Sequence, residues 1–214
     1  YMSDNDNNFE SIKVGCFGES SVGKTYFSRK YVGDPNIDFV ISTIGVEYFT
    51  RKKMLSNGKK YKITIYDTAG QERFRSFCMN SIRPCDGFIL MYDITKRDTF
   101  ELISKWIEDI FEIKEKDCPF ILVGNKSDLK NIREVSEEEG LKAAENYHTE
   151  YFETSAKKGI NVEEAFEGLL NKIIIKKEKK SKKKKQKMNE KNVNNLQLDA
   201  KKSGDKKKHK CCGN

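Results

Sequence analysis

The feature that most restricts how this chain can fold is one short segment, Gly18-Glu19-Ser20-Ser21-Val22-Gly23-Lys24-Thr25. It has the spacing of a phosphate-binding loop: glycine, four residues, glycine, lysine, and then serine or threonine. A strand-like segment, 11–17, precedes it, and a helical pattern, 24–31, follows it. Backbone N–H groups in such a loop, together with the helix N-terminus, form a cradle for phosphate. The alternative is a glycine turn that matches the pattern by chance.

Five further segments have the patterns of strands. Residues 46–55 and 60–67 alternate with strand periodicity around Asn57-Gly58, a strong hairpin signal, and we expect them to pair antiparallel. Residues 87–93 and 120–125 are continuous apolar runs, which are typical of strands buried on both faces. Residues 151–154 are the last and shortest of these segments.

Helical patterns separate most of these strands. Asp98, with Glu101 three residues later, is the expected N-cap of the helix between residues 93 and 120, and Ser136 with Glu139 begins another. Apolar residues recur at helical spacing over 162–173. The order β-α-β-β-α-β-α-β-α-β-α predicts an α/β fold: a doubly wound, mostly parallel six-stranded sheet with one antiparallel edge strand. In such a sheet, ligands bind at the carboxyl ends of the strands, where the motifs of this chain lie.

Charge divides the chain into two parts. From Lys172 onward there are seventeen lysines and four acidic residues, a net charge of +13, which leaves −5 for residues 1–171 out of the overall +8. We therefore expect a flexible N-terminus (1–10), a mildly acidic globular domain (11–176) and a disordered lysine-rich tail (177–214). This distribution argues against a cationic nucleic-acid-binding domain, although a solvated linker of biased composition or nucleic-acid binding by the tail alone remain alternatives.

The sequence also predicts where the protein resides. The longest apolar runs, 87–92 and 120–124, are far shorter than the roughly 20 residues of a membrane-spanning helix, and residues 1–10 are polar and acidic, unlike a secretory signal. We expect a cytosolic chain.

Two more motifs complete a nucleotide site. Asp67, at the end of a strand, can supply a carboxylate to the water shell of a Mg²⁺ ion, while Gln71 can orient an attacking water. Asn125-Lys126-Ser127-Asp128 follows the strand 120–125, and Asp128 can accept hydrogen bonds from the N1 and N2 donors of guanine, which adenine cannot provide together. The alternatives are a helix cap for Asp67 and a surface turn for the tetrapeptide.

With these motifs in order, residues 11–176 resemble a small GTPase of the Ras superfamily and, within it, the Rab family. Ser42-Thr43-Ile44-Gly45-Val46-Glu47 is similar to the Rab switch I segment, and Glu153-Thr154-Ser155-Ala156-Lys157 is similar to the guanine-contacting loop. The resemblance implies that Thr43 ligates Mg²⁺, that Ala156 offers its N–H to guanine O6, and that Lys126 lies against the base. The residues assigned in this way to GTP or GDP are Gly18, Glu19, Ser20, Ser21, Val22, Gly23, Lys24, Thr25, Tyr26, Thr43, Gly70, Asn125, Lys126, Asp128, Ser155, Ala156 and Lys157.

The expected activity is slow hydrolysis of GTP to GDP, with Gln71 and Lys24 as catalytic residues and Mg²⁺ held by Thr25, Thr43 and, through water, Asp67. The resemblance implies an exchange factor, an activating protein that supplies an arginine, a GDP-dissociation inhibitor and an escort protein. Effectors would bind residues 41–49 and 70–82 and so regulate vesicle-mediated traffic. We expect a monomer that binds no nucleic acid.

Some positions depart from the family pattern. Asn36 occupies the position of an aromatic ring that covers guanine, and Val40 that of a tyrosine that covers the γ-phosphate. Tyr48 and Tyr66 replace a phenylalanine and a tryptophan of the effector surface, and Ser81-Ile82 replaces a tyrosine pair. These departures predict an altered grip on the nucleotide and altered effector specificity.

The segment Cys211-Cys212-Gly213-Asn214 resembles a double geranylgeranylation signal. Single prenylation of Cys211 as a C-a-a-X motif is the alternative, although Cys212-Gly213 is not aliphatic. Two lipid chains would anchor the protein stably, with the lysines attracted to anionic lipid. The resemblance implies a protein that cycles between the cytosol and the cytoplasmic face of an intracellular membrane.

Two other function classes compete with this interpretation. A phosphate-loop ATPase or kinase is disfavoured by residues 125–128, and competition between GTP and ATP would separate the two. A non-enzymatic module that holds nucleotide permanently would show no single-turnover hydrolysis.

Overall fold

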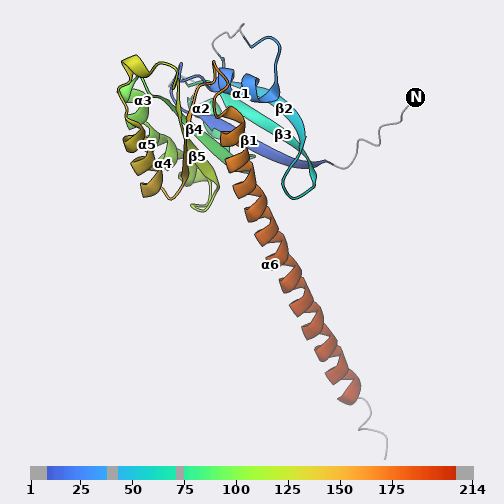
Figure 1. The fold of residues 1–214 in the computed structure, drawn as a ribbon. Helices are drawn as coiled ribbons and strands as arrows, with labels where there is room; N and C mark the ends of the chain where they lie inside the picture. Colours follow the sequence, from blue (N-terminus) through green and yellow to red (C-terminus); the bar gives the residue numbers. More distant parts are fainter. Residues whose placement is uncertain (1–8, 38–42, 71–74, 206–214) are drawn as a thin grey trace, which may run out of the picture. The chain divides into compact units, whose positions relative to one another are not determined.

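The computed structural model describes residues 9–37, 43–70 and 75–205, with side chains left out at 75–78 and at most positions beyond 183. Its centre is a six-stranded sheet in the order β2-β3-β1-β4-β5-β6 (Figure 1). All neighbouring strands are parallel except β2 and β3, so the predicted fold class, with its antiparallel edge strand, is confirmed. The strands are β1 (Glu10–Phe17), β2 (Val46–Met54), β3 (Lys60–Thr68), β4 (Gly87–Asp93), β5 (Phe120–Asn125) and β6 (Glu150–Thr154).

Helices cover both faces of the sheet. They are α1 (Lys24–Val32), α2 (Arg75–Ile82), α3 (Arg97–Glu101), α4 (Ile103–Ile113), α5 (Glu137–Asn146) and α6 (Val162–Asp205), with a short 3₁₀ turn at Lys130–Ile132. Alternate residues of β4, among them Leu90 and Tyr92, join a core with α2, α4 and α5. On the other face, the Phe166 ring of α6 stacks on Tyr31 of α1, with ring centroids 3.7 Å apart. The two apolar layers fix the sheet, and with it the ends of its strands.

The edge strand β2 is tied to the start of α6 by ion pairs. Arg51 lies 2.6 Å from Glu163, and Lys53 contacts both Glu163 and Glu167, the latter at 2.6 Å. The Arg51 guanidinium also lies over the Tyr31 ring, 4.5 Å from its centroid. Charge pairing and packing therefore hold this edge of the sheet together.

Capping residues set two helix starts, one as predicted and one not. Ser136 and Glu139 form a reciprocal capping box, with distances of 3.2 and 2.8 Å, which confirms the predicted start of α5. The prediction of Asp98 as an N-cap is wrong: α3 begins at Arg97, and the Asp98 side chain accepts from the adjacent N–H of Thr99. The Thr99 hydroxyl instead donates to the Lys96 carbonyl and accepts from the N–H of Asp93, which ties this helix start to the end of β4. The predicted single helix is also divided at Leu102 into α3 and α4.

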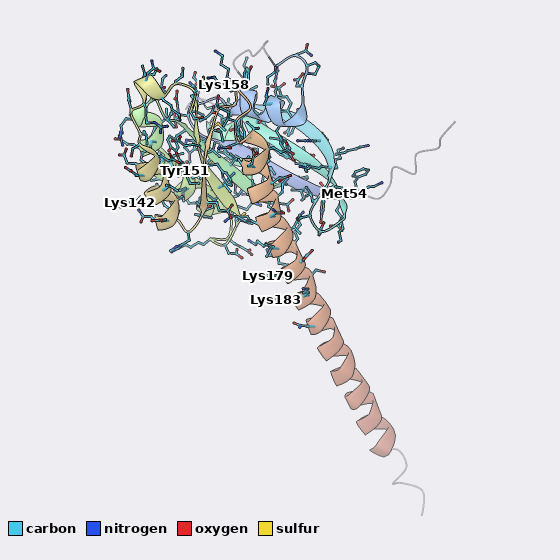
Figure 2. All side chains as sticks on the ribbon, viewed as in Figure 1. Met54, Lys142, Tyr151, Lys158, Lys179 and Lys183 are labelled. Atoms are coloured by element: carbon cyan, nitrogen blue, oxygen red, sulfur yellow. The ribbon has the colours of Figure 1, made fainter. Side chains whose placement is uncertain are left out.

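The chain divides into two compact units, residues 1–173 and 174–214. The sequence predicted a disordered segment from residue 177, whereas the structure continues helix α6 to Asp205. Lysine, glutamate and glutamine have high helix propensity, and there is no proline beyond Pro119 and no glycine between Gly168 and Gly204. Figure 2 shows the exposed Lys179 and Lys183 on this helix. Local helix propensity thus favours the helical form of the segment that follows residue 177.

Candidate nucleotide-binding site

The predicted phosphate loop lies between β1 and α1, and two of its glycines are required by geometry. Gly18 has φ 142°, and a Cβ there would lie 2.1 Å from the Met91 carbonyl oxygen. Gly23 has φ 102°, and a Cβ would lie 2.4 Å from Asn125 Nδ2. Only glycine allows the loop to pass so close to β4 and β5. Val22 is buried, while Ser20 and Ser21 are exposed on the loop, the latter with φ 62°.

Lys24 begins helix α1 and is almost fully buried. Its ammonium group donates to the carbonyl oxygens of Gly18 at 2.9 Å and Glu19 at 2.7 Å. These bonds fold the lysine back over the loop, so its charge lies beside the N-terminus of α1. Tyr26 is the third residue of α1 and is half-buried. A cation and a helix N-terminus at one point favour an anion there.

Three oxygen-bearing side chains meet beside this loop. Thr25 Oγ1 lies 2.9 Å from Thr43 Oγ1 and donates to Asp67 Oδ2 at 2.6 Å, and Thr43 Oγ1 lies 3.4 Å from the same carboxylate oxygen. Asp67 is fully buried, and its Oδ1 has no hydrogen-bond partner among the described residues. Burial raises its pKa to about 6, while hydrogen bonding by Thr25 and the charge of Lys24 oppose that rise.

This cluster fits a divalent cation. Hydroxyl and carboxylate oxygens are ligands that Mg²⁺ prefers. A cation would also supply the positive charge that balances the buried Asp67 carboxylate. The three side chains come from α1, from the segment before β2 and from the end of β3. The structure therefore brings together the three residues that the sequence assigned to the metal.

Asn125 ties the second half of the site to the phosphate loop. Its side chain donates to the Val22 carbonyl at 2.8 Å and accepts from the Ala156 N–H at 3.0 Å and the Thr154 hydroxyl at 3.1 Å. The Ala156 N–H, expected to face guanine O6, therefore binds Asn125 in this structure. A hydrogen bond to the base would have to share or replace that contact.

Asp128 and Lys126 occupy the loop after β5. Asp128 Oδ1 accepts from the Ser155 hydroxyl at 2.6 Å, so the predicted carboxylate is held in place by the other guanine-contacting loop. Lys126 has φ 69° and forms an ion pair with the buried Asp93 at 2.6 Å. Asp93 was not among the predicted residues, although a carboxylate at the end of a buried strand is a signal in the sequence. Lys157 lies on the loop after β6 and is exposed.

Several predicted residues lie outside the part of the chain that the structure describes: Gln71, Val40, Cys211 and Cys212. Gly70, by contrast, is described and lies against the phosphate loop, because a Cβ there would lie 2.3 Å from the Glu19 carbonyl carbon. Tyr48, which is 60% exposed, meets Tyr66 edge to face with ring centroids 4.8 Å apart. Ser81 and Ile82 are buried, which removes them from the surface on which a tyrosine pair was expected.

A substitution at Asn36 tests the prediction that this position lacks the aromatic ring that would cover guanine. It lies exposed in a turn after α1, where its N–H donates to Asp34 at 2.9 Å and its carbonyl accepts from Arg29 at 3.2 Å. Asn36→Phe is expected to slow spontaneous GDP release about 3- to 10-fold, because a stacked ring contributes about 0.5–1.5 kcal/mol. Release of a fluorescent GDP analogue measures it, with Asn36→Ala as the control. An unchanged release rate would show that cover at this position does not limit release.

Within residues 9–37, 43–70 and 75–205, no helix is both long and apolar enough to cross a membrane.

Comparison with known proteins agrees with this geometry. The Ras family pattern matches residues 13–175. The chain is 41% identical over 169 residues to Ras-related protein Rab-3A of Homo sapiens, covering 78% of this chain and 76% of the relative. It is 41% identical over 167 residues to Rab-3C of Bos taurus, covering 78% and 73%, and 40% identical over 201 residues to Rab-8 of Diplobatis ommata, covering 92% of both. The chain therefore belongs to the Ras family, in which it is a Rab small GTPase.

Proposed function

We propose that this Rab GTPase regulates vesicle-mediated membrane traffic by binding effectors in its GTP form and releasing them after hydrolysis. Membership of the family establishes a GTP-binding switch with GTPase activity. The traffic role rests on the likeness to Rab-3A, Rab-3C and Rab-8.

The observation that carries the proposal is the contact of Thr43 with Thr25 and Asp67. Thr43 precedes β2 and lies next to Ile44, whose side chain is 80% exposed. A ligand that holds the Thr43 hydroxyl therefore also fixes an exposed apolar side chain in the adjacent segment. This is the linkage that an effector needs in order to distinguish GTP from GDP.

Each part of the site would contribute to binding and hydrolysis. Thr25, Thr43 and, through water, Asp67 would hold Mg²⁺, which neutralises charge on the β- and γ-phosphates when bound. Lys24 would add a second positive charge at the same phosphates, and Gln71 would orient the attacking water. Asp128 would select guanine, with Lys126, Ser155, Ala156 and Lys157 around the base.

We expect partner proteins to complete the nucleotide cycle. Because these residues alone would hydrolyse GTP slowly, we expect an activating protein that provides an arginine. Because the nucleotide would be bound tightly, we expect an exchange factor that promotes its release. Effectors would read residues 41–49 and 70–82, where the exposed Tyr48 and its neighbour Tyr66 give a surface unlike that of relatives with phenylalanine and tryptophan. A GDP-dissociation inhibitor and an escort protein would handle the prenylated chain.

Single-turnover hydrolysis tests the enzymatic part. Wild-type protein loaded with radiolabelled GTP in Mg²⁺ buffer should release phosphate slowly, whereas Gln71→Leu should retain GTP. Excess unlabelled GTP should displace the bound nucleotide and excess ATP should not. Displacement by ATP would favour the ATPase interpretation, and no hydrolysis by wild type would favour a permanent nucleotide-binding module. Localising tagged wild type and Gln71→Leu in cells then tests the traffic role, which predicts enrichment of the variant on one intracellular membrane.

Membrane attachment is expected to require both Cys211 and Cys212. One lipid chain gives reversible binding and two give stable binding, while the attraction of lysines to anionic lipid fades within a Debye length of about 8 Å. Either single Cys→Ser variant should be partly soluble, with a bound fraction that falls as salt rises, and the double variant should be fully soluble. Cell fractionation measures this. A double variant that stays bound in high salt would show that something other than prenylation anchors the chain.

A further inference from the structure

Trp106 of α4 contacts the phosphate loop through a polar bond. It is the only tryptophan of the chain and is 2% exposed. Its indole N–H donates to Glu19 Oε1 at 2.9 Å, across 87 positions of sequence. Its ring packs against Phe17 at the end of β1, with ring centroids 5.9 Å apart. One buried side chain thus contacts both the strand that leads into the loop and the second residue of the loop.

The backbone of Glu19 occupies a junction in the site. Its carbonyl oxygen accepts from Lys24 Nζ at 2.7 Å. On its other side lies Gly70, where a Cβ would come within 2.3 Å of the Glu19 carbonyl carbon and 2.4 Å of the Ser20 nitrogen. A shift of Glu19 would therefore move both the ammonium group and the backbone that approaches the phosphate end of the site.

Electrostatics gives the bond a further effect. A carboxylate within a loop that cradles phosphate repels the ligand unless it is held away, and its repulsion is strongest for the more highly charged triphosphate. The Trp106 N–H supplies a hydrogen bond to the charged carboxylate, which is stronger than a bond between neutral groups. The same bond satisfies a buried indole donor, whose loss would be unfavourable.

We propose that Trp106 is a positioning residue for GTP hydrolysis, acting through its hydrogen bond to Glu19 on the placement of Lys24 and Gly70. The proposal rests on the nucleotide site proposed above. It predicts that α4, which contributes no residue to that site, controls the rate of the reaction.

The test compares variants that remove the donor, the acceptor or only the charge. Trp106→Phe keeps a ring against Phe17 but lacks the N–H, and is expected to lower the single-turnover rate of GTP hydrolysis about tenfold while GDP affinity changes less than about threefold. Glu19→Gln retains an oxygen acceptor and should hydrolyse GTP faster than Glu19→Ala, which has none. The double variant Trp106→Phe/Glu19→Ala should be no slower than Glu19→Ala alone, because both changes remove one interaction. Thermal unfolding with GDP bound confirms that each variant is folded.

Opposite results would overturn the proposal. These are a Trp106→Phe variant as fast as wild type, single effects that multiply in the double variant, or a Glu19→Gln variant as slow as Glu19→Ala. Tryptophan fluorescence adds a readout that mere loss of stability would not move, since Trp106 is the only emitter of its kind. Its emission should change as bound GTP is hydrolysed, and Glu19→Ala should abolish that change; an equal change in Glu19→Ala would count against the coupling. Failure of the wild type to bind GTP would refute the nucleotide site itself. Normal hydrolysis by the wild type, together with an equal rate for Trp106→Phe, would refute only this inference.

Discussion

Asp128→Asn is expected to lower affinity for GTP about 10²- to 10⁴-fold and to raise affinity for xanthosine triphosphate. Guanine offers two donors to the carboxylate, and each hydrogen bond to a charged group contributes about 1.5–3 kcal/mol. An asparagine presents an N–H₂ group where xanthine has a carbonyl oxygen, so the pairing is restored with the other base. Asparagine keeps an oxygen for the Ser155 hydroxyl, which lies 2.6 Å from Asp128 Oδ1, so the loop should hold its position.

Equilibrium competition of both triphosphates against a fluorescent nucleotide measures this exchange. Asp128→Ala is the matched control, because it removes the carboxylate without adding a donor and should lose GTP without gaining the xanthine nucleotide. If Asp128→Asn still preferred GTP by the wild-type margin, the base would not lie at Asp128.

Thr25→Asn is expected to weaken GTP about 10- to 100-fold more than GDP. The Thr25 hydroxyl contacts both Thr43 and Asp67, and loss of a group that orients a metal ligand typically lowers metal affinity by such a factor. A bound Mg²⁺ would neutralise charge that only the triphosphate has on its γ-phosphate, so the loss should fall mainly on GTP.

Titration of each nucleotide at several Mg²⁺ concentrations measures the difference. Thr25→Ser keeps the hydroxyl and should behave like wild type. An equal loss of GTP and GDP, independent of Mg²⁺, would mean that Thr25 only supports the start of α1.

The fold could be predicted from the sequence, and the residues of the candidate site could be expected at one edge of the sheet, because their signals are local. Continuous apolar runs marked β4 and β5, Asn57-Gly58 marked the hairpin, and the motifs followed strands whose carboxyl ends meet at one edge. The contacts between distant side chains could not be predicted in this way. Periodicity contains no information about which residue of α4 meets Glu19, or that Asp93 pairs with Lys126.

One error of prediction has the same cause. Asp98 stands three residues before Glu101, as an N-cap would, but the hydroxyl of Thr99 ties the chain to the end of β4 and moves the helix start. A tertiary hydrogen bond there takes precedence over a local preference. The N–H of Ala156 donates to Asn125, and its role toward the base stays a prediction.

The ion pairs that hold β2 to α6 bear on the solubility of the protein. The outer backbone of an edge strand can pair with a strand of another molecule, and charged side chains are a common protection against such growth. Arg51 and Lys53 provide that protection here, and Glu163 and Glu167 keep them in place. A chain truncated before Val162 would lose both acidic partners together with the apolar cover of the sheet. Such a fragment would form oligomers by strand addition along β2, so the intact helix protects the protein from aggregation.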